Sequence, residues 1–154
     1  FAMMRPSEYD NLIRTSALEE VPQTPGAIEG FLKDAAESLE VARTVDVKRP
    51  KQRFILAYEG FYSLVQAVLE FYSVRTKESG RNLAILRAAA DLNLDADEIK
   101  LVSVAHGRRN DTTYRSPFPP ISRAEAQAMI DILGKTLPVA HTLTGVPAPA
   151  AGQA

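Results

Sequence analysis

The chain has 154 residues, of which 45% are hydrophobic and 24% are charged, the balance of an ordinary soluble domain. It contains no Cys and only 2 His, which excludes a disulfide scaffold, a Cys-ligated zinc site and thiol catalysis, and argues against a His-based metal site. The 18 Lys and Arg residues against 19 Asp and Glu residues leave a formal net charge of -1. Binding to nucleic acid would therefore require the positive charge to be clustered.

No targeting or membrane-spanning segment is apparent in the sequence. Residues 1–6 lack the long apolar run of a signal peptide. The most apolar window, residues 54–72, contains Glu59, Gln66 and Glu70, and carboxylates are costly at the centre of a bilayer. We therefore expect a cytoplasmic protein that has no membrane partner.

The spacing of apolar residues is helical along almost the whole chain, and alternation with a period of two is hard to find. The pattern predicts helices, in chain order, over Ser7–Glu19, from Thr24 to residue 44, over Lys51–Glu78, Arg81–Leu92 and Asp95–Tyr114, and from Ser122 onwards. Short links between helices favour antiparallel neighbours. The predicted fold class is all-α: an antiparallel helical bundle of four main helices plus a shorter helix.

Composition divides the chain into three parts. We expect an N-terminal segment with a short helix over residues 1–23 and the helical bundle domain over residues 24–144. The tail over residues 145–154 is rich in Pro, Ala and Gly and has nothing to bury, so we expect it to be mobile.

Helix ends and helix packing are also marked in the sequence. Asp95 with Glu98, and Ser122 with Glu125, have the spacing of capping boxes, which begin helices. The third predicted helix is apolar on most of its faces and should lie at the centre of the bundle. Gly60 inside it lowers helix propensity, so we expect a close approach between helices at that position.

The predicted helix over Asp95–Tyr114 changes character along its inward face. Its first half presents the apolar Ile99 and Val102 at helical spacing. The second half keeps the period with polar side chains: His106, Arg109, Asn110, Thr113 and Tyr114. A helix that faces a core cannot bury Arg and Asn without partners, so the pattern predicts a polar pocket or interface. The alternative is that the helix extends beyond the core and these side chains are solvated.

Basic residues are expected to gather where helices end. If the long helices alternate in direction, the ends of the third and fifth predicted helices come together. That end would hold seven basic residues: Arg75, Lys77, Arg81, Arg108, Arg109, Arg115 and Arg123. The planar fork of Arg suits phosphate, although basic residues near helix C-termini also favour the helix dipole.

A second basic group lies in the link before the third predicted helix. It contains Arg43, Lys48, Arg49, Lys51 and Arg53. We expect it at the opposite end of the bundle. We interpret it as a solvated turn that offers a weak secondary contact surface.

The segment Arg109-Asn110-x-x-x-Tyr114, near the end of a late helix in a small all-α bundle, resembles the HEPN superfamily (higher eukaryotes and prokaryotes nucleotide-binding domain). The resemblance covers about residues 24–137 and includes Ala57-Tyr-Glu-Gly-Phe-Tyr62, which is typical of the central helix of that family. The family motif is an Arg followed four to six residues later by a His, with Asn, Asp or His commonly beside the Arg. The resemblance implies a place among metal-independent ribonucleases of toxin–antitoxin, defence or RNA-processing systems, or among members that bind nucleotides or RNA without cleavage. Members commonly dimerise with the motif at the two-fold interface.

In this resemblance Arg109 takes the position of the family Arg, Asn110 the adjacent polar position, and Tyr114 the position of the His. A Tyr, with an ordinary pKa of about 10, does not exchange protons near neutral pH as a His does. The substitution therefore weighs against cleavage and leaves phosphate binding by Arg109 intact. The candidate catalytic residues are Arg109, Tyr114 and His106. The candidate residues for binding RNA or a nucleotide are Arg109, Asn110, Arg108, Arg115, Arg75 and Arg81. We expect no metal site and no cofactor.

Two functions follow from the sequence. The first is an HEPN-like homodimer that binds RNA or a nucleotide at Arg109; it would be a metal-independent endoribonuclease if active, and we expect binding without cleavage. The second is a helical protein–protein interaction module, such as an antitoxin-like or scaffold subunit. Binding that weakens steeply with added salt would favour the first function, because phosphate contacts release counterions.

Overall fold

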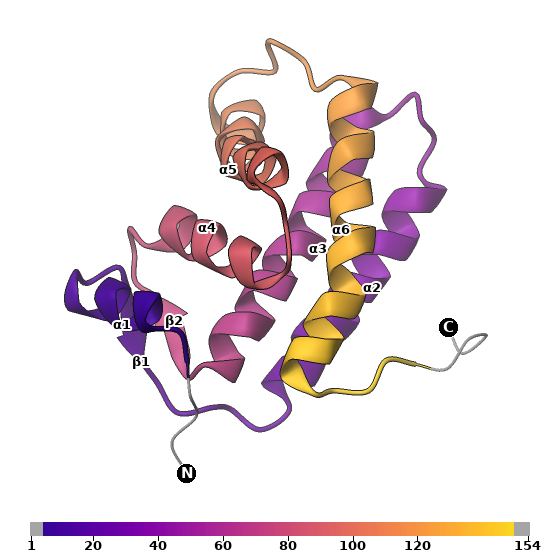
Figure 1. The fold of residues 1–154 in the computed structure, drawn as a ribbon. Coiled ribbons are helices and arrows are strands. Elements are labelled where there is room, and N and C mark those ends of the chain that lie inside the picture. The colour runs from indigo at the N-terminus through magenta and orange to yellow at the C-terminus, as the bar shows by residue number, and fades with distance from the viewer. Residues whose placement is uncertain (1–4, 150–154) are drawn as a thin grey trace.

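The computed structural model describes residues 5–149, and this part of the chain is mostly helical (Figure 1). Its elements are α1 (Ser7–Arg14), β1 (Leu18–Glu20), α2 (Ala27–Thr44), α3 (Pro50–Phe71), β2 (Val74–Thr76), α4 (Arg81–Asp91), α5 (Ala96–Asn110), the π-helical turn η1 (Asp111–Arg115) and α6 (Arg123–Thr144). The all-α class is therefore confirmed.

α3 lies at the centre of the domain, and α2 and α6 pack along it (Figure 1). Gly60 sits where these three helices meet. A Cβ added at Gly60 would lie 2.7 Å from Cδ2 of Leu133 in α6 and 2.8 Å from Cβ of Ser38 in α2. The close approach expected at this glycine is therefore confirmed.

α3 alone, among the helices in residues 5–149, has the length and hydropathy of a membrane span. Most of its apolar window is buried inside the fold, against the neighbouring helices. The central helix of a soluble domain has these properties, because it packs against neighbours on several faces.

A pair of short strands interrupts the helical order and is not predicted by the apolar pattern. The third helix ends at Phe71 instead of Glu78, and β2 then pairs antiparallel with β1, with Leu18 opposite Thr76. Strands of three residues are too short to show a period of two in the sequence. The predicted first helix likewise ends early, at Arg14. The strand pairing joins the N-terminal segment to the rest of the domain.

α4 and α5 form a pair that packs against one side of α3 (Figure 1). α5 is strongly foreshortened in the view in which α3 and α6 run along the page, so α5 crosses α3 instead of running along it. The end of α5 lies beside the first half of α3, where Arg109 meets Glu59. The expectation that the ends of the third and fifth helices come together is therefore wrong. β2 and the short α4 carry the chain back along α3 before α5 begins.

The helix starts predicted at Asp95 and Ser122 are confirmed, whereas the helix predicted from Thr24 begins at Ala27, after Gly26. Asp95 Oδ1 accepts a hydrogen bond from the backbone N–H of Glu98 at 2.8 Å, and Ser122 Oγ accepts one from the backbone N–H of Glu125 at 3.0 Å. Both capping boxes are complete, because each Glu side chain also accepts from the capping residue's own N–H.

The predicted boundary before the tail falls at the end of α6, where Gly145 has a φ of 76°. Residues 150–154 of the tail lie outside the described residues, as do residues 1–4 of the N-terminal segment. The mobility of the tail stays a prediction.

Candidate functional site

The polar half of α5 packs against α3 and ends in a π-helical turn. His106, Arg109 and Asn110 are half-buried there. In η1 the backbone N–H of Ser116 donates to the carbonyl of Asp111 at 2.8 Å, and the hydroxyl of the buried Thr112 donates to the carbonyl of Arg108 at 2.9 Å. π-helical turns are rare in proteins overall, and those that occur often lie at functional sites. The alternative in which these side chains simply extend into solvent does not hold for His106, Arg109 or Asn110, but it does hold for Thr113 and Tyr114, which are exposed.

His106 is held between two polar side chains. Its Nδ1 lies 2.6 Å from the hydroxyl of Tyr58 in α3, and its Nε2 lies 3.4 Å from Nδ2 of Asn110. Oδ1 of Asn110 accepts a hydrogen bond from Arg109 at 3.3 Å, which turns the amide nitrogen of Asn110 towards His106. We therefore assign Nε2 as an acceptor and place the imidazole proton on Nδ1, from which it is donated to Tyr58.

The surroundings of this pair keep both rings neutral. Burial lowers the pKa of His106, and the positive charges of Arg81 and Arg109 lower it further. Burial raises the pKa of Tyr58 to about 12. At neutral pH the two rings therefore form an uncharged hydrogen-bonded pair in the neighbourhood of two guanidinium groups.

Arg109 is only partly satisfied by its protein partners. Its guanidinium donates to Oε1 of Glu59 in α3 at 2.7 Å, while its Nε is buried and makes no hydrogen bond to any described residue. The guanidinium carbon lies 5.7 Å from the centre of the Tyr114 ring, and Tyr114 is 73% exposed. Arg109 thus places positive charge beside an aromatic ring that is open to solvent.

A second guanidinium reaches the same place from α4. Arg81 lies over the ring of Tyr62, 4.1 Å from its centre, and the Tyr62 ring stacks on that of Tyr58 with 6.5 Å between centres. Arg81 and Arg109 therefore reach the His106–Tyr58 pair from two different helices, α4 and α5. Arg81 and Arg109 are both predicted site residues, and the fold brings them together. The cause is the packing of α4 and α5 on α3, and not the expected meeting of the ends of two helices.

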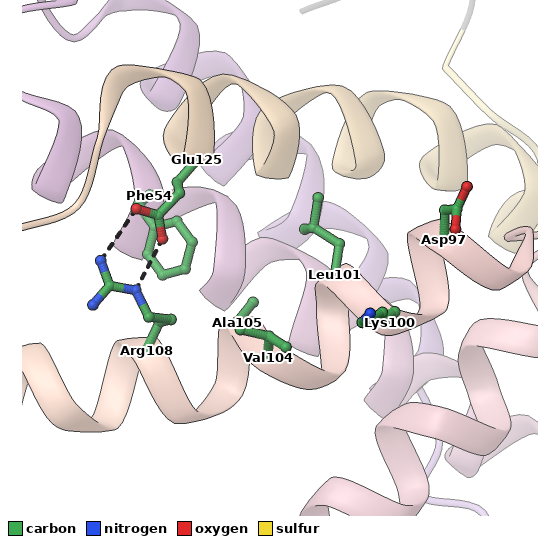
Figure 2. A pocket seen from close by; sticks show the side chains of 8 residues that line it. All are labelled: Phe54, Asp97, Lys100, Leu101, Val104, Ala105, Arg108 and Glu125. Atoms are coloured by element: carbon green, nitrogen blue, oxygen red, sulfur yellow. Dashed lines mark hydrogen bonds and ion pairs between the residues drawn. The ribbon is translucent and has the colours of Figure 1, made fainter.

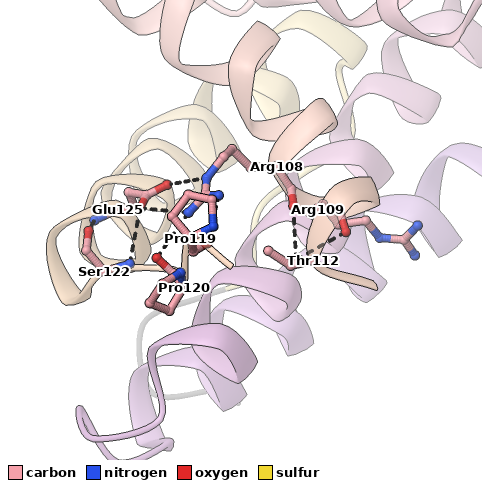
Figure 3. Close-up of polar contacts among 7 residues, drawn as sticks. All are labelled: Arg108, Arg109, Thr112, Pro119, Pro120, Ser122 and Glu125. Atoms are coloured by element: carbon pink, nitrogen blue, oxygen red, sulfur yellow. Dashed lines mark hydrogen bonds and ion pairs between the residues drawn. The ribbon is translucent and has the colours of Figure 1, made fainter. Parts of the chain in front are cut away.

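The side chains of Arg108 and Arg109 point in different directions, as Figure 3 shows. The guanidinium of Arg108 forms an ion pair with Glu125 at 2.9 Å and donates to the carbonyls of Pro119 at 3.0 Å and Pro120 at 3.2 Å. It points towards the loop before α6, while the side chain of Arg109 points away from it (Figure 3). Arg108 anchors this loop and does not line the Arg109 site.

The remaining members of the expected basic cluster are dispersed. Arg75 lies on β2 and pairs with Glu19 of β1 at 2.5 Å. Arg115 is exposed and pairs with Asp111 within η1 at 3.4 Å. A single basic end that gathers all seven residues is therefore not formed, because β2 and α6 carry Arg75 and Arg123 to other elements.

The second basic group is not at the opposite end of the molecule. Lys48, Arg49 and Lys51 line a hollow together with Thr112 of η1 and Phe118. The prediction of a distant position is wrong because α5 ends beside the beginning of α3.

Arg53 is also not part of a solvated turn. It is buried and donates to the carbonyl of Ala42 at 3.2 Å and to Oε1 of Gln127 at 3.3 Å. It joins α2, α3 and α6 inside the fold.

An apolar hollow of about 310 Å³ lies between α5 and the start of α6 (Figure 2). Phe54, Leu101 and Ala105 supply apolar surface, and Val104 beside them is 54% exposed. The Arg108–Glu125 ion pair closes one end of the hollow (Figure 2).

Tyr58, Glu59 and Tyr62 of α3 also belong to the site, although the polar pattern on α5 does not indicate them. Their signal in the sequence is weak, because two Tyr four residues apart fit the apolar face of any central helix. Among residues 5–149, no three acidic or His side chains lie close enough together to hold a metal ion. Comparison of the chain with protein families, with curated proteins and with solved structures finds no match.

Proposed function

We propose that this chain is an HEPN-like domain that binds RNA or a nucleotide at the Arg109 site. The observation that carries the proposal is that Arg109 and Arg81 both lie close enough to the His106–Tyr58 pair to lower the pKa of His106, with Arg109 beside the exposed ring of Tyr114. Two guanidinium groups and an open aromatic ring suit a phosphate with its neighbouring base.

Arg109 would contact the phosphate, and Glu59 occupies part of its hydrogen-bonding capacity in the free protein. The Glu59 side chain is 44% exposed, so its carboxylate has room to leave when an anion arrives. A phosphate would then replace one charge-assisted hydrogen bond by another and would bring additional acceptor oxygens. Tyr114 would stack on the base.

The site supports binding better than cleavage. Both nitrogens of His106 already have partners, and the pKa of Tyr58 is raised to about 12. If RNA is cut, Arg109 would stabilise the charge that develops on the phosphate, and His106 or Tyr114 would move the protons. Cleavage of purified RNA, tested with Tyr114→Phe and His106→Ala, separates the two proton carriers.

The proposal extends to fold and assembly. α2, α3, α5 and α6 would be the four main helices of an HEPN-like bundle, with α4 as the shorter one. The second half of α5 would lie at the interface of a homodimer, and the exposed Val104 and Tyr114 support this placement. A toxin–antitoxin, defence or RNA-processing system would be the setting.

The second candidate function is a protein–protein interaction module. The apolar hollow beside Val104 supports it, because exposed apolar surface of this kind suits a partner side chain. On this account the polar residues around His106 only fix α5 to α3.

A titration of the protein with a 5′-phosphorylated dinucleotide, followed by NMR, tests the first proposal. We expect the largest shifts at His106, Arg109 and Tyr114, with binding that weakens as salt is added. The absence of shifts at all three residues, or shifts that gather at Leu101 and Val104 instead, would contradict it.

A further inference from the structure

We propose that the hollow between the start of α3 and the loop before α6 is a second contact for single-stranded RNA, in which an unpaired base stacks on Phe118. The neighbouring phosphates would contact Lys48, Arg49 and Lys51. This inference rests on the proposed function of the Arg109 site and extends it, because it makes the ligand an oligonucleotide strand instead of a single nucleotide.

The hollow has a volume of about 340 Å³ and joins three segments that are distant in the sequence. One wall is the basic link that leads into α3, another is the loop that leads into α6, and Thr112 of η1 also lines the hollow. Lys48 and Arg49 are exposed, and Lys51 is half-buried. The surface therefore presents three cations beside one aromatic side chain.

Phe118 is 76% exposed, which is unusual because Phe side chains are most often buried in folded proteins. Its loop is nevertheless firmly held. Pro117 and Pro119 flank it, its backbone N–H donates to Ser116 Oγ at 3.2 Å, and Arg108 holds the carbonyls of the prolines that follow (Figure 3). A ring presented on a fixed backbone loses little conformational entropy on binding, which favours its use as a stacking platform.

The three cations are free to meet an anion. None of them forms an ion pair with a carboxylate in residues 5–149. Asp46, the acidic residue of the link, accepts a hydrogen bond at 2.8 Å from the backbone N–H of Lys48 and forms no ion pair with the three side chains. The first turn of α3 carries no acidic residue, so the positive end of its dipole adds to the same field.

η1 connects the hollow to the Arg109 site. Thr112 lines the hollow, and its hydroxyl also donates to the carbonyl of Arg109 at 3.3 Å, while the side chain of Arg109 points to the other side of the turn (Figure 3). Arg115 and Tyr114 lie on the same five-residue turn. A strand bound at Arg109 can therefore continue across η1 to Phe118. The base on Phe118 has to be unpaired, because a paired base offers its face only to its neighbours in the duplex.

The test compares a 5′-phosphorylated dinucleotide with a single-stranded RNA of about 12 nucleotides, a length within the range of known single-strand sites. Phe118→Ala should weaken binding of the longer RNA about tenfold, the usual effect of losing one stacked base, and Phe118→Tyr should restore it. Lys48→Ala combined with Arg49→Ala should lower the salt dependence of the longer RNA by about 1.4 in the slope of log K against log salt, since each phosphate contact contributes about 0.7. Lys33→Ala, an exposed change on α2, is the control and should leave both ligands unaffected.

The outcomes separate this inference from the proposed function. If Arg109→Ala weakens both ligands but the Phe118 and Lys48/Arg49 variants bind the longer RNA as the wild type does, the second contact is wrong and the first site stands. If those variants weaken the longer RNA while Arg109→Ala does not, the hollow binds RNA and the proposed function is wrong. If the wild type binds neither ligand, both are wrong.

Discussion

The hydroxyl of Tyr58 and Nδ1 of His106 lie 2.6 Å apart across the contact between α3 and α5. α5 buries only Val102 and Ala105 fully, and Ile99 and Leu101 in its first half pack partly against the core. The hydrogen bond to His106 holds the polar end of the helix against α3. One turn further on, Arg109 pairs with Glu59 of the same helix α3.

Tyr58→Phe removes this hydrogen bond and leaves the half-buried Nδ1 of His106 without a partner. We expect the free energy of unfolding to fall by about 1–2 kcal/mol, the usual effect of an unsatisfied buried donor, as measured by urea denaturation. Tyr62→Phe is the matched control, because the Tyr62 hydroxyl has no hydrogen-bond partner among the described residues. Equal losses in the two variants would show that the Tyr58–His106 bond contributes nothing.

The lowered pKa of His106 predicts the direction in which stability depends on pH. The unfolded chain binds a proton at this residue more readily than the folded chain, because burial and the two guanidinium groups oppose the imidazolium. The stabilisation is therefore complete above the unfolded pKa of about 6.5 and is lost as the pH falls below it towards the folded pKa. We expect the urea midpoint to fall between about pH 7.5 and pH 5.5, and to fall less in His106→Gln. An NMR titration midpoint of His106 at or above its ordinary value would contradict this account.

Glu59→Gln tests whether Glu59 competes with the ligand for Arg109. The amide keeps the size of the side chain and removes its charge, so a phosphate no longer has to displace a carboxylate. We expect the phosphorylated dinucleotide to bind about two- to fivefold more tightly, the range expected from losing a partly exposed ion pair. Glu37→Gln, an exposed change on α2, is the control for altered net charge. Weaker binding in Glu59→Gln than in the control would mean that Glu59 assists the ligand.

Gly60→Ala tests the packing of the three central helices. Its methyl group would lie 2.7 Å from Leu133 Cδ2 and 2.8 Å from Ser38 Cβ, so the helices would have to move apart. We expect a net loss of about 1–2 kcal/mol in the free energy of unfolding, after the gain in helix propensity is subtracted. Gly30→Ala on α2 has open space around the added methyl group and should stabilise the protein by up to about 1 kcal/mol. Stabilisation of similar size in both variants would contradict the close approach.

Local features of the fold could be predicted from the sequence because their causes are local. The capping box at Asp95 and the tight contact at Gly60 depend on a few neighbouring residues or on one missing side chain. The pairing of β1 with β2 depends on strands of three residues, which are too short for a periodic signal. The burial of Arg53 depends on acceptors from Ala42 and Gln127 in other helices.

The candidate site could be predicted in part for the same reason. The period of α5 placed His106, Arg109 and Asn110 on one inward stripe without any knowledge of the neighbouring helix. The contribution of Glu59 depends on the direction in which α5 crosses α3, and no pattern within either helix specifies a crossing direction. The position of Phe118 beside the basic link also depends on the direction in which α5 crosses α3, so it could not be predicted from the sequence either.

Arg109→Ala, assayed with the 5′-phosphorylated dinucleotide, tests the central claim most directly. We predict that binding weakens about tenfold or more, because charge-assisted hydrogen bonds to a phosphate are lost from a partly enclosed site. Arg75→Ala is the matched control, since Arg75 also pairs with a glutamate but lies on β2, and it should change binding less than about twofold. If Arg109→Ala binds the dinucleotide as tightly as Arg75→Ala does, the Arg109 site is not where nucleotides bind, and the interaction-module function would take its place.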